Sequence, residues 1–124
     1  MHPRNKSVLQ SLNLSLNHNL NLTDPIGYID FLALMKNAEL VITDSGGIKE
    51  ETTYLGVQCI TVRNNTERPI MVEVGTNYLT GIIMADIEST ATKILNREKK
   101  KGRIPEFWNG KSSERIVEKL VNSI

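Results

Sequence analysis

The sequence predicts an α/β fold, in which a parallel β-sheet is covered by helices on both faces. Short β-prone apolar runs alternate along the chain with segments of helical periodicity, which is the order of βαβ units. Successive units of this kind place their strands in parallel and their helices over the sheet. The length of 124 residues suits one compact unit and is too short for two full domains with a cleft between them.

The first part of the chain contains an ambiguous segment, a strand and a helix. Residues 7–17 carry leucines that fit both an alternating and a helical pattern, and we favour a helix. Residues 20–22 are predicted to form a short strand, which ends where the sequence Thr-Asp-Pro favours a turn. Residues 28–37 are predicted to be helical, because their apolar side chains recur on one helical face.

The middle of the chain alternates strands with helices. Three β-prone runs predict strands at residues 39–43, 58–62 and 77–81. A helix is expected over residues 48–55, and Gly56 ends it. After the second strand, a loop leads to a helix that begins at Pro69, since proline is common in the first turn of helices.

Two helices are predicted to close the chain, at residues 86–96 and 112–121. Each begins at a residue type that commonly caps a helix, Asp86 in the first and Ser112 in the second. The basic segment between them, residues 97–103, is interpreted as a solvated linker.

Composition and charge argue against several classes of function. Fifteen Lys and Arg against fourteen Asp and Glu give a net charge of +1, so no global field favours nucleic acid or an anionic membrane surface. The single cysteine, Cys59, excludes an internal disulfide and a multi-cysteine metal site, and its apolar neighbours predict a buried, reduced thiol. The N-terminus lacks a signal-peptide core, and no apolar run approaches the roughly 18 residues of a membrane span. We therefore expect a cytoplasmic protein without a metal or cofactor.

The stretch "LVITDSGGIKEE", residues 40–51, suggests a ligand site. In parallel α/β sheets, ligands lie beyond the carboxyl ends of strands, where helix N-termini present free amides. Ser45, Gly46 and Gly47 fall at such a place, where glycine lets the backbone approach a phosphate and serine adds a hydroxyl donor. The alternative is a plain strand-to-helix turn, because neither a dinucleotide fingerprint nor a phosphate loop is present.

Two carboxylates and an arginine bear on this choice. Glu50 can simply complement the helix dipole, but Glu51 lies about 6 Å beyond Gly47 along the helix axis. A phosphate on the amides and a sugar hydroxyl on Glu51 could both be accommodated, which is the layout of a nucleoside diphosphate. Arg68 follows the next strand and could pair with phosphate oxygens; the alternative is a structural salt bridge with Glu67 or Glu73.

The sequence resembles the C-terminal part of the non-hydrolysing UDP-N-acetylglucosamine 2-epimerases. The likeness is carried by "TDSGG" with "EE" and, about fifteen residues later, by "TERP". It extends from "HPR" at residues 2–4 through "FWNGKSSERIVEKL" near the end, and thus covers nearly the whole chain. These enzymes resemble the two-domain GT-B glycosyltransferases, whose active site lies between two Rossmann-like domains. The resemblance implies that residues 1–124 are a Rossmann-like, UDP-binding portion of the C-terminal domain.

The resemblance also implies roles for individual residues. The diphosphate would be held by Ser45, Gly46 and Gly47. Glu51 would bind the ribose hydroxyls, and Arg68 would bind a further polar group of the nucleotide. The base would lie against Ile26 and the side chain of Phe31, although ordinary helix packing is the alternative for Phe31. His2 is assigned to a strand end near the cleft, and His18 to solvent.

Two departures and one absence qualify the resemblance. Gln58 stands where the family usually has proline, and Asn109 where "WDG" is common; both lie outside the proposed pocket and should be tolerated. The family's chains are much longer. Their catalytic acid and base carboxylates belong to an N-terminal domain that this sequence does not include.

The family reaction converts UDP-N-acetylglucosamine to UDP-N-acetylmannosamine, a step that resemblance links to cell-surface polysaccharide biosynthesis. Our first hypothesis is the nucleotide-diphosphate-binding part of such an isomerase, inactive alone, from a truncated reading frame or a split enzyme. The second is a non-catalytic module that binds UDP or a UDP-sugar, and the third is the donor domain of a UDP-sugar glycosyltransferase. Expected partners are UDP or a UDP-N-acetylhexosamine, with a separate N-terminal domain or a second copy of the chain.

Overall fold

The computed structural model describes residue 11 and residues 19–123. By its internal contacts the chain divides into two units, Met1–Leu34 and Met35–Ile124, and each is described by itself. The boundary falls within helix α2 (Tyr28–Lys36), so the single unit expected from length appears as two contact units. The second unit carries the sheet.

The sheet has three parallel strands in the order β1-β2-β3. Their bounds are Val41–Thr43 for β1, Cys59–Thr61 for β2 and Asn77–Leu79 for β3. The central positions Ile42, Ile60 and Tyr78 lie side by side in register. Each strand falls within a predicted run, and the predicted parallel pairing is confirmed.

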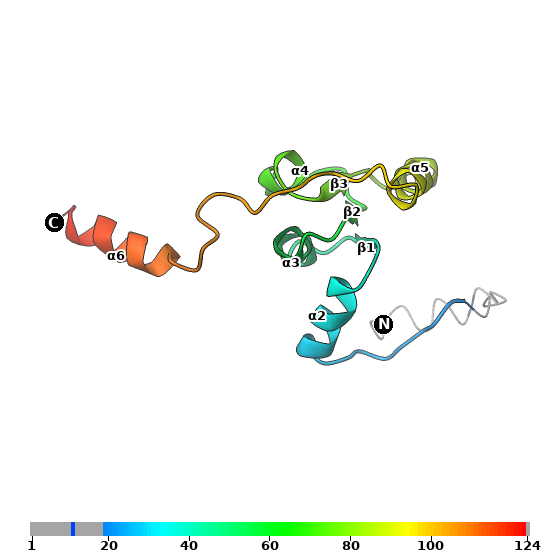
Figure 1. Ribbon diagram of the computed structural model, residues 1–124, viewed down its shortest axis with the longest axis horizontal. Coiled ribbons are helices and arrows are strands. Elements are labelled where there is room, and N and C mark those ends of the chain that lie inside the picture. Colours follow the sequence, from blue (N-terminus) through cyan, green and yellow to red (C-terminus); the bar gives the residue numbers. More distant parts are fainter. Residues whose placement is uncertain (1–10, 12–18, 124) are drawn as a thin grey trace. The chain divides into compact units, whose positions relative to one another are not determined.

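Helices cover both faces of this sheet. Figure 1 shows α3 (Ile48–Leu55) and α4 (Ile70–Glu73) on one side of the three strands and α5 (Met84–Leu95) on the other. The last helix, α6, spans Ser112–Val121 and buries none of its residues. The prediction of a Rossmann-like α/β unit with helices on both faces is confirmed.

Helix α3 ends as the sequence predicts. Gly56 adopts a φ of 73°, a left-handed conformation that glycine reaches without a Cβ penalty. Its amide donates to the Thr52 and Thr53 carbonyls, and the Val57 amide returns to the Thr52 carbonyl at 2.9 Å. This reversal satisfies the last carbonyls of the helix and leads directly into β2.

The core between α3 and the sheet is largely polar. Helix α3 contacts all three strands, and Thr52 and Thr53 of α3 are buried together with Cys59, Thr61 and Asn77 of the strands. The Asn77 side-chain amide donates to the Thr61 hydroxyl at 2.8 Å. On the opposite face of β2, apolar packing is provided by Ile60 and, from α5, by Ile94, both fully buried.

Three sequence-based predictions are corrected by the structure. Residues 20–22 form no strand; they have no ladder partner, and the chain is irregular from residue 20 to 27. Helix α5 begins at Met84, two residues before Asp86, and its N-cap is Ile83 without a side-chain cap. Helix α6 is likewise preceded by Lys111 without a side-chain cap, so Ser112 is the first helical residue and not the cap.

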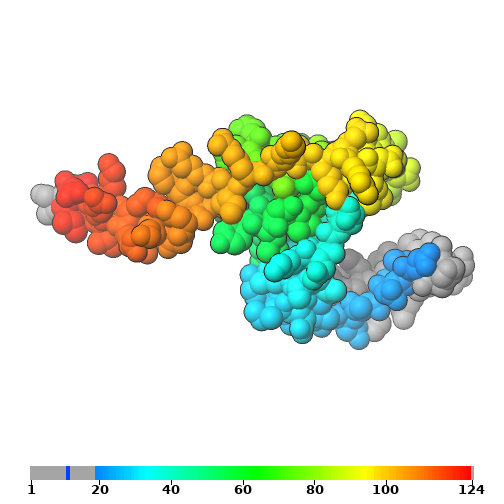
Figure 2. Space-filling model, in the orientation of Figure 1, coloured from blue at the N-terminus to red at the C-terminus, as the bar shows by residue number. Residues whose placement is uncertain are grey.

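The basic segment at residues 97–103 is partly buried and is not a purely solvated linker. Lys100 donates from its ammonium to the carbonyls of Val72 (2.7 Å) and Asn77 (2.6 Å), and burial lowers its pKa. A Cβ on Gly102 would approach the Gly75 backbone to 2.8 Å, so only glycine fits this crossing. In Figure 2 the segment after α5 lies directly against the residues around β3.

Some predictions lie outside the described residues. They include the helix at residues 7–17 and the assignments of His2 and His18. Among the helices of the part that is described, none is long and apolar enough to cross a membrane.

Candidate functional site

The glycine turn, defined as residues 45–47, joins the end of β1 to the start of α3. The Ser45 amide donates to the Thr43 hydroxyl at 3.0 Å, which fixes the chain as it leaves the strand. Gly47 is the N-cap of α3 and makes no side-chain cap hydrogen bond. The first amides of a helix have no intrahelical acceptor, so this end of α3 presents donors and the positive end of its dipole.

The glycines of this turn are not required by the fold. Gly47 has a φ of −72° and a ψ of −41°, an ordinary right-handed conformation, and Gly46 has no positive φ. A Cβ added at either position would meet nothing within 4 Å. The space beside both glycines is therefore open on the side where a side chain would project.

The arginine loop, defined as residues 66–68, is held against the first turn of α3. Lys49 of α3 is 1% exposed, and its ammonium donates to the Thr66 hydroxyl at 2.6 Å and to the Glu67 carboxylate at 3.3 Å. The Thr66 hydroxyl in turn accepts the Arg68 amide at 3.2 Å. Lys49 thus ties the loop that carries Arg68 to the helix that follows the glycine turn.

Arg68 forms an ion pair with Glu50, which is a second connection between α3 and the arginine loop besides that made by Lys49. The sequence alternatives for Arg68 were Glu67 and Glu73, whereas Glu67 pairs with Lys49 and with Arg63 (3.2 Å). The Arg68 side chain is 57% exposed and that of Glu50 33%, so the pair lies at the surface and is worth little to stability. Because the pair is exposed, Arg68 can exchange partners.

The electrostatics of the loop keep its carboxylate charged. The pKa of the Glu67 carboxyl is held below its usual range. The largest cause is a hydrogen bond from the backbone amide of Glu67 itself, and the hydrogen bond from Lys49 and the positive charge of Arg63 add to it. Glu67 therefore stays ionised at neutral pH and compensates the buried Lys49 ammonium.

Glu51 lies on α3 directly after Glu50 and is half-buried. Its amide donates to the Gly47 carbonyl at 3.3 Å, so its backbone belongs to the first turn after the glycine turn. Of the predicted site residues, the second unit therefore contains the glycine turn, Glu51 and Arg68.

Ile26 and Phe31 belong to the first unit. Ile26 is 41% exposed in the irregular segment before α2, and Phe31 is half-buried on that helix, with its amide bonded to the Gly27 carbonyl at 2.9 Å. Their predicted contact with a base stays a prediction.

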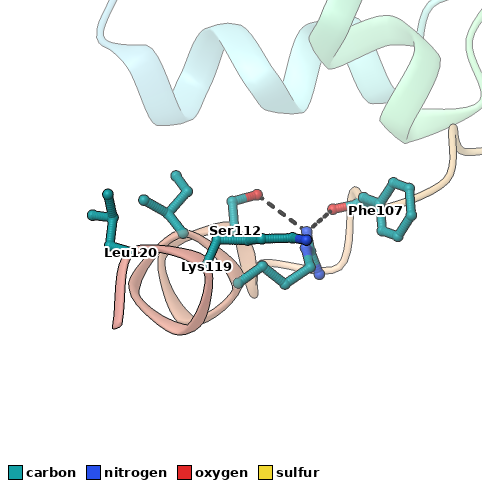
Figure 3. Close-up of a pocket in the computed structure, with 6 residues that line it drawn as sticks. Phe107, Ser112, Lys119 and Leu120 are labelled. Carbon is teal, nitrogen blue, oxygen red and sulfur yellow. Dashed lines mark hydrogen bonds between the residues drawn. The ribbon is translucent and has the colours of Figure 1, made fainter. Parts of the chain in front are cut away.

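Two hollows lie away from the predicted residues. One, of about 470 Å³, borders α6 and is lined by residues that include Phe107, Ser112 and Leu120. The Arg115 guanidinium donates to the Phe107 carbonyl and to the Ser112 hydroxyl there, as the dashed lines in Figure 3 show. Another, of about 330 Å³, lies between the end of β3 and α5. Within the residues that the structure describes, no group of three or more His, Cys, Asp or Glu could hold a metal ion.

Sequence reasoning missed the buried lysine and its partners. It treated Glu50 as a dipole complement and did not consider Lys49 or Thr66. A signal was present, because Lys49 precedes Thr52 and Thr53 by three and four residues and must share their face of the helix. That face is buried against the sheet.

Comparison with known proteins supplies further findings. The sequence profile described as UDP-N-acetylglucosamine 2-epimerase matches residues 1–121. The UDP-N-acetylglucosamine 2-epimerase of Methanocaldococcus jannaschii is 47% identical over 121 residues, which are 94% of this chain and 32% of that protein. The UDP-2,3-diacetamido-2,3-dideoxy-D-glucuronate 2-epimerase of Pseudomonas aeruginosa is 35% identical over 97% of this chain and 33% of its own length. The chain thus spans about a third of these relatives.

A solved structure is similar as well. The crystal structure of the Methanocaldococcus jannaschii enzyme in complex with UDP-GlcNAc and UDP matches with a TM-score of 0.79 and 46% identity. The match covers 98% of this chain and 34% of that one.

Proposed function

The chain belongs to the UDP-N-acetylglucosamine 2-epimerase family, and from this premise we propose that it forms the nucleotide-diphosphate-binding part of such an epimerase. The complete enzyme would convert UDP-N-acetylglucosamine to UDP-N-acetylmannosamine. Residues 1–124 would be a portion of its C-terminal domain, and the rest of the catalytic machinery would come from sequence that this chain does not contain.

The observation that carries the proposal is the open glycine turn. A turn that needs glycine for its own sake uses a positive φ or a close backbone contact, and Gly46 and Gly47 have neither. What a Cβ would obstruct there is a group outside this chain. Donor amides and a helix dipole favour an anion at that position, and a diphosphate fits this chemistry.

The surrounding residues would complete the nucleotide site. Ser45 would add a hydroxyl donor to the diphosphate, Glu51 would accept the ribose hydroxyls, and Arg68 would pair with an oxygen of the nucleotide. For Ile26 and Phe31, which belong to the first unit, contact with the base is proposed from the family resemblance alone. Anion stabilisation of this kind favours departure of UDP from C2-deprotonated sugar, which is the contribution that this part of the chain can make to the reaction.

Proton transfer at C2 needs one group to remove the proton and another to return it on the opposite face. We propose that those groups lie in the part of the enzyme outside these 124 residues, so that the isolated chain binds but does not turn over. A separate N-terminal domain, or a second copy of the chain, would be the partner. The free, buried thiol of Cys59 supports a cytoplasmic location, where thiols stay reduced.

A direct test uses Gly47→Val. Because a Cβ at this position meets nothing within 4 Å, the variant should keep the wild-type fold. It should nevertheless lose UDP binding, since the branched side chain fills the space that a diphosphate needs. Nuclear magnetic resonance titration of the wild type with UDP should shift the amide signals of residues 45–51. Shifts confined to residues 97–103, or unchanged binding by the variant, would refute the proposal.

The same titration can test whether this chain contacts the sugar as well as the nucleotide. One relative is named for a UDP-diacetamido-glucuronate, so nucleotide recognition and sugar recognition are separable within this family. Equal affinities for UDP and UDP-N-acetylglucosamine would indicate that this chain contacts the nucleotide alone.

A further inference from the structure

Two neighbouring residues of α3 bind two neighbouring residues of the arginine loop. Lys49 contacts Glu67, and Glu50 contacts Arg68. The charges alternate, cation then anion on the helix and anion then cation on the loop, so slippage of the loop by one residue would place like charges together. This arrangement specifies which loop residue lies beside which helix residue.

The two ion pairs differ in burial, and only one of them fixes the loop. The side chain of Lys49 is 2% exposed, whereas those of Glu50 and Arg68 lie at the surface. A buried ammonium is costly unless its donors are satisfied. Both side-chain partners found for Lys49 belong to the loop, so displacement of the loop would leave a buried charge without them.

The Thr66 hydroxyl passes this constraint on to Arg68. It accepts one hydrogen bond from Lys49 at 2.6 Å and another from the Arg68 amide at 3.2 Å. The backbone of Arg68 is therefore located by a chain of two hydrogen bonds from α3. Its exposed guanidinium is left free to exchange one anionic partner for another.

We propose that Lys49 is a positioning residue for nucleotide binding, which holds the arginine loop so that the Arg68 guanidinium stays beside the first turn of α3, the turn that follows residues 45–47. The inference rests on the proposed function. Lys49 itself does not touch the diphosphate. By ordering the loop before the ligand binds, it reduces the conformational entropy that Arg68 loses when a phosphate oxygen replaces the Glu50 carboxylate.

The test is a double-mutant cycle between Lys49→Met and Arg68→Ala in the 124-residue chain. Methionine is unbranched and nearly as long as the apolar stem of lysine, with a sulfur in place of one methylene, and it lacks the ammonium. It should raise the Kd for UDP about tenfold, because the loop must then be ordered on binding. The Kd for uridine, which has no phosphate, should stay within about twofold. In the Arg68→Ala background, Lys49→Met should have no further effect on UDP.

Further variants keep the test decisive if Lys49→Met fails to fold. Glu67→Gln changes an exposed residue and removes the ion pair with Lys49. It should also raise the Kd for UDP, but by a smaller factor than Lys49→Met does. Lys49→Arg keeps the charge and should restore part of the affinity. Lys93→Met, at an exposed lysine in the last turn of α5, is the matched control and should bind like the wild type.

The outcomes separate this inference from the proposed function. If the wild type does not bind UDP, the proposed function fails and the positioning role fails with it. If the wild type binds UDP but Lys49→Met and Glu67→Gln bind equally well, only the positioning role is overturned. Equal losses for UDP and uridine, persisting in the Arg68→Ala background, would show that Lys49 merely stabilises the fold.

Discussion

The side chain of Gln58 pairs with the backbone of Lys100 in the manner of a neighbouring strand. Its amide nitrogen donates to the Lys100 carbonyl at 3.2 Å, and its amide oxygen accepts the Lys100 amide at 3.0 Å. The Tyr78 hydroxyl donates to the same oxygen at 3.1 Å. Gln58 is only 5% exposed, so these bonds are shielded from water and fasten the segment after α5 to the sheet.

Gln58→Ala should therefore lower the free energy of unfolding by about 1 to 3 kcal/mol, since it removes the amide that donates to the shielded Lys100 carbonyl and leaves the Lys100 amide with the Tyr78 hydroxyl alone. Urea denaturation at neutral pH measures the change. Asn65→Ala, in the exposed part of the loop before α4, is the control and should alter stability by less than about 0.5 kcal/mol. A Gln58→Ala variant as stable as the control would mean that water replaces the amide at no cost.

The sequence predicted the fold where local patterns decide it. The three strands and helices α3 and α6 lie where apolar runs and Gly56 place them. It failed where an element depends on distant partners. Residues 20–22 have strand-like composition but no ladder, and the burial of Lys100 depends on Gln58 and Tyr78, more than twenty residues away in sequence.

The sequence predicted individual residues of the candidate site but not the ion pairs and hydrogen bonds that join them. The glycine turn and Glu51 are local to one strand-helix junction, so a single stretch of sequence reveals them. The partner of Arg68 could not be found in this way, because Glu50 lies on another element, and so do the two loop partners of Lys49. Long-range ion pairs leave no periodic signal in a sequence.

A second prediction concerns Cys59, because burial raises the pKa of its thiol above the ordinary value of a cysteine. Since the folded state then holds the thiol proton more tightly than the unfolded state, the contribution of this thiol to stability is fully present below the unfolded-state pKa and is lost as the pH rises through the folded-state pKa. The decline should approach about 1.4 kcal/mol per pH unit between the unfolded and folded pKa values. Denaturation between pH 7 and pH 11 measures it. Cys59→Ala should show a shallower decline over the same range, and identical slopes would contradict the assignment.

A third prediction is that the isolated 124-residue chain does not epimerise UDP-N-acetylglucosamine. Stabilising a departing diphosphate cannot replace groups that transfer the C2 proton. Purified protein incubated with the substrate in deuterated water should incorporate no deuterium at C2 beyond a protein-free control. Incorporation that is lost in Gly47→Val would mean that residues of this chain carry out the proton transfer. The proposal that the proton-transfer groups lie outside these 124 residues would then be wrong.

A fourth prediction isolates the ribose contact of Glu51. Glu51→Gln removes a charged acceptor and should weaken UDP binding by about 1 to 2 kcal/mol. The loss should be smaller for 2′-deoxy-UDP, which lacks one of the hydroxyls. Glu88→Gln, on α5, controls for the change in net charge. Calorimetric titration of both variants with both ligands decides the matter; a loss of the same size for the two ligands would reduce Glu51 to a residue that supports the helix.

The last prediction follows from the ion pair between Glu50 and Arg68. In the ligand-free chain this pair occupies the guanidinium, so a phosphate must compete with the Glu50 carboxylate for it. Glu50→Gln should therefore tighten UDP binding, by up to about fivefold, the range that corresponds to an exposed ion pair. Arg68→Ala should have the opposite effect and should flatten the salt dependence of UDP binding, because one phosphate contact is lost. Neither variant should change the affinity for uridine.

Arg63→Ala is the matched control for this experiment, since Arg63 lies near the same loop and pairs with Glu67 rather than with Glu50. It removes one positive charge from the neighbourhood but leaves the Glu50–Arg68 pair intact, so any nonspecific field effect on UDP will appear in it as well. Weaker binding by Glu50→Gln would mean that the carboxylate supports Arg68 in its binding position instead of competing for it. Equal losses of UDP and uridine in Arg68→Ala would remove the arginine from the site, because a residue that pairs with phosphate has no reason to affect a ligand without one.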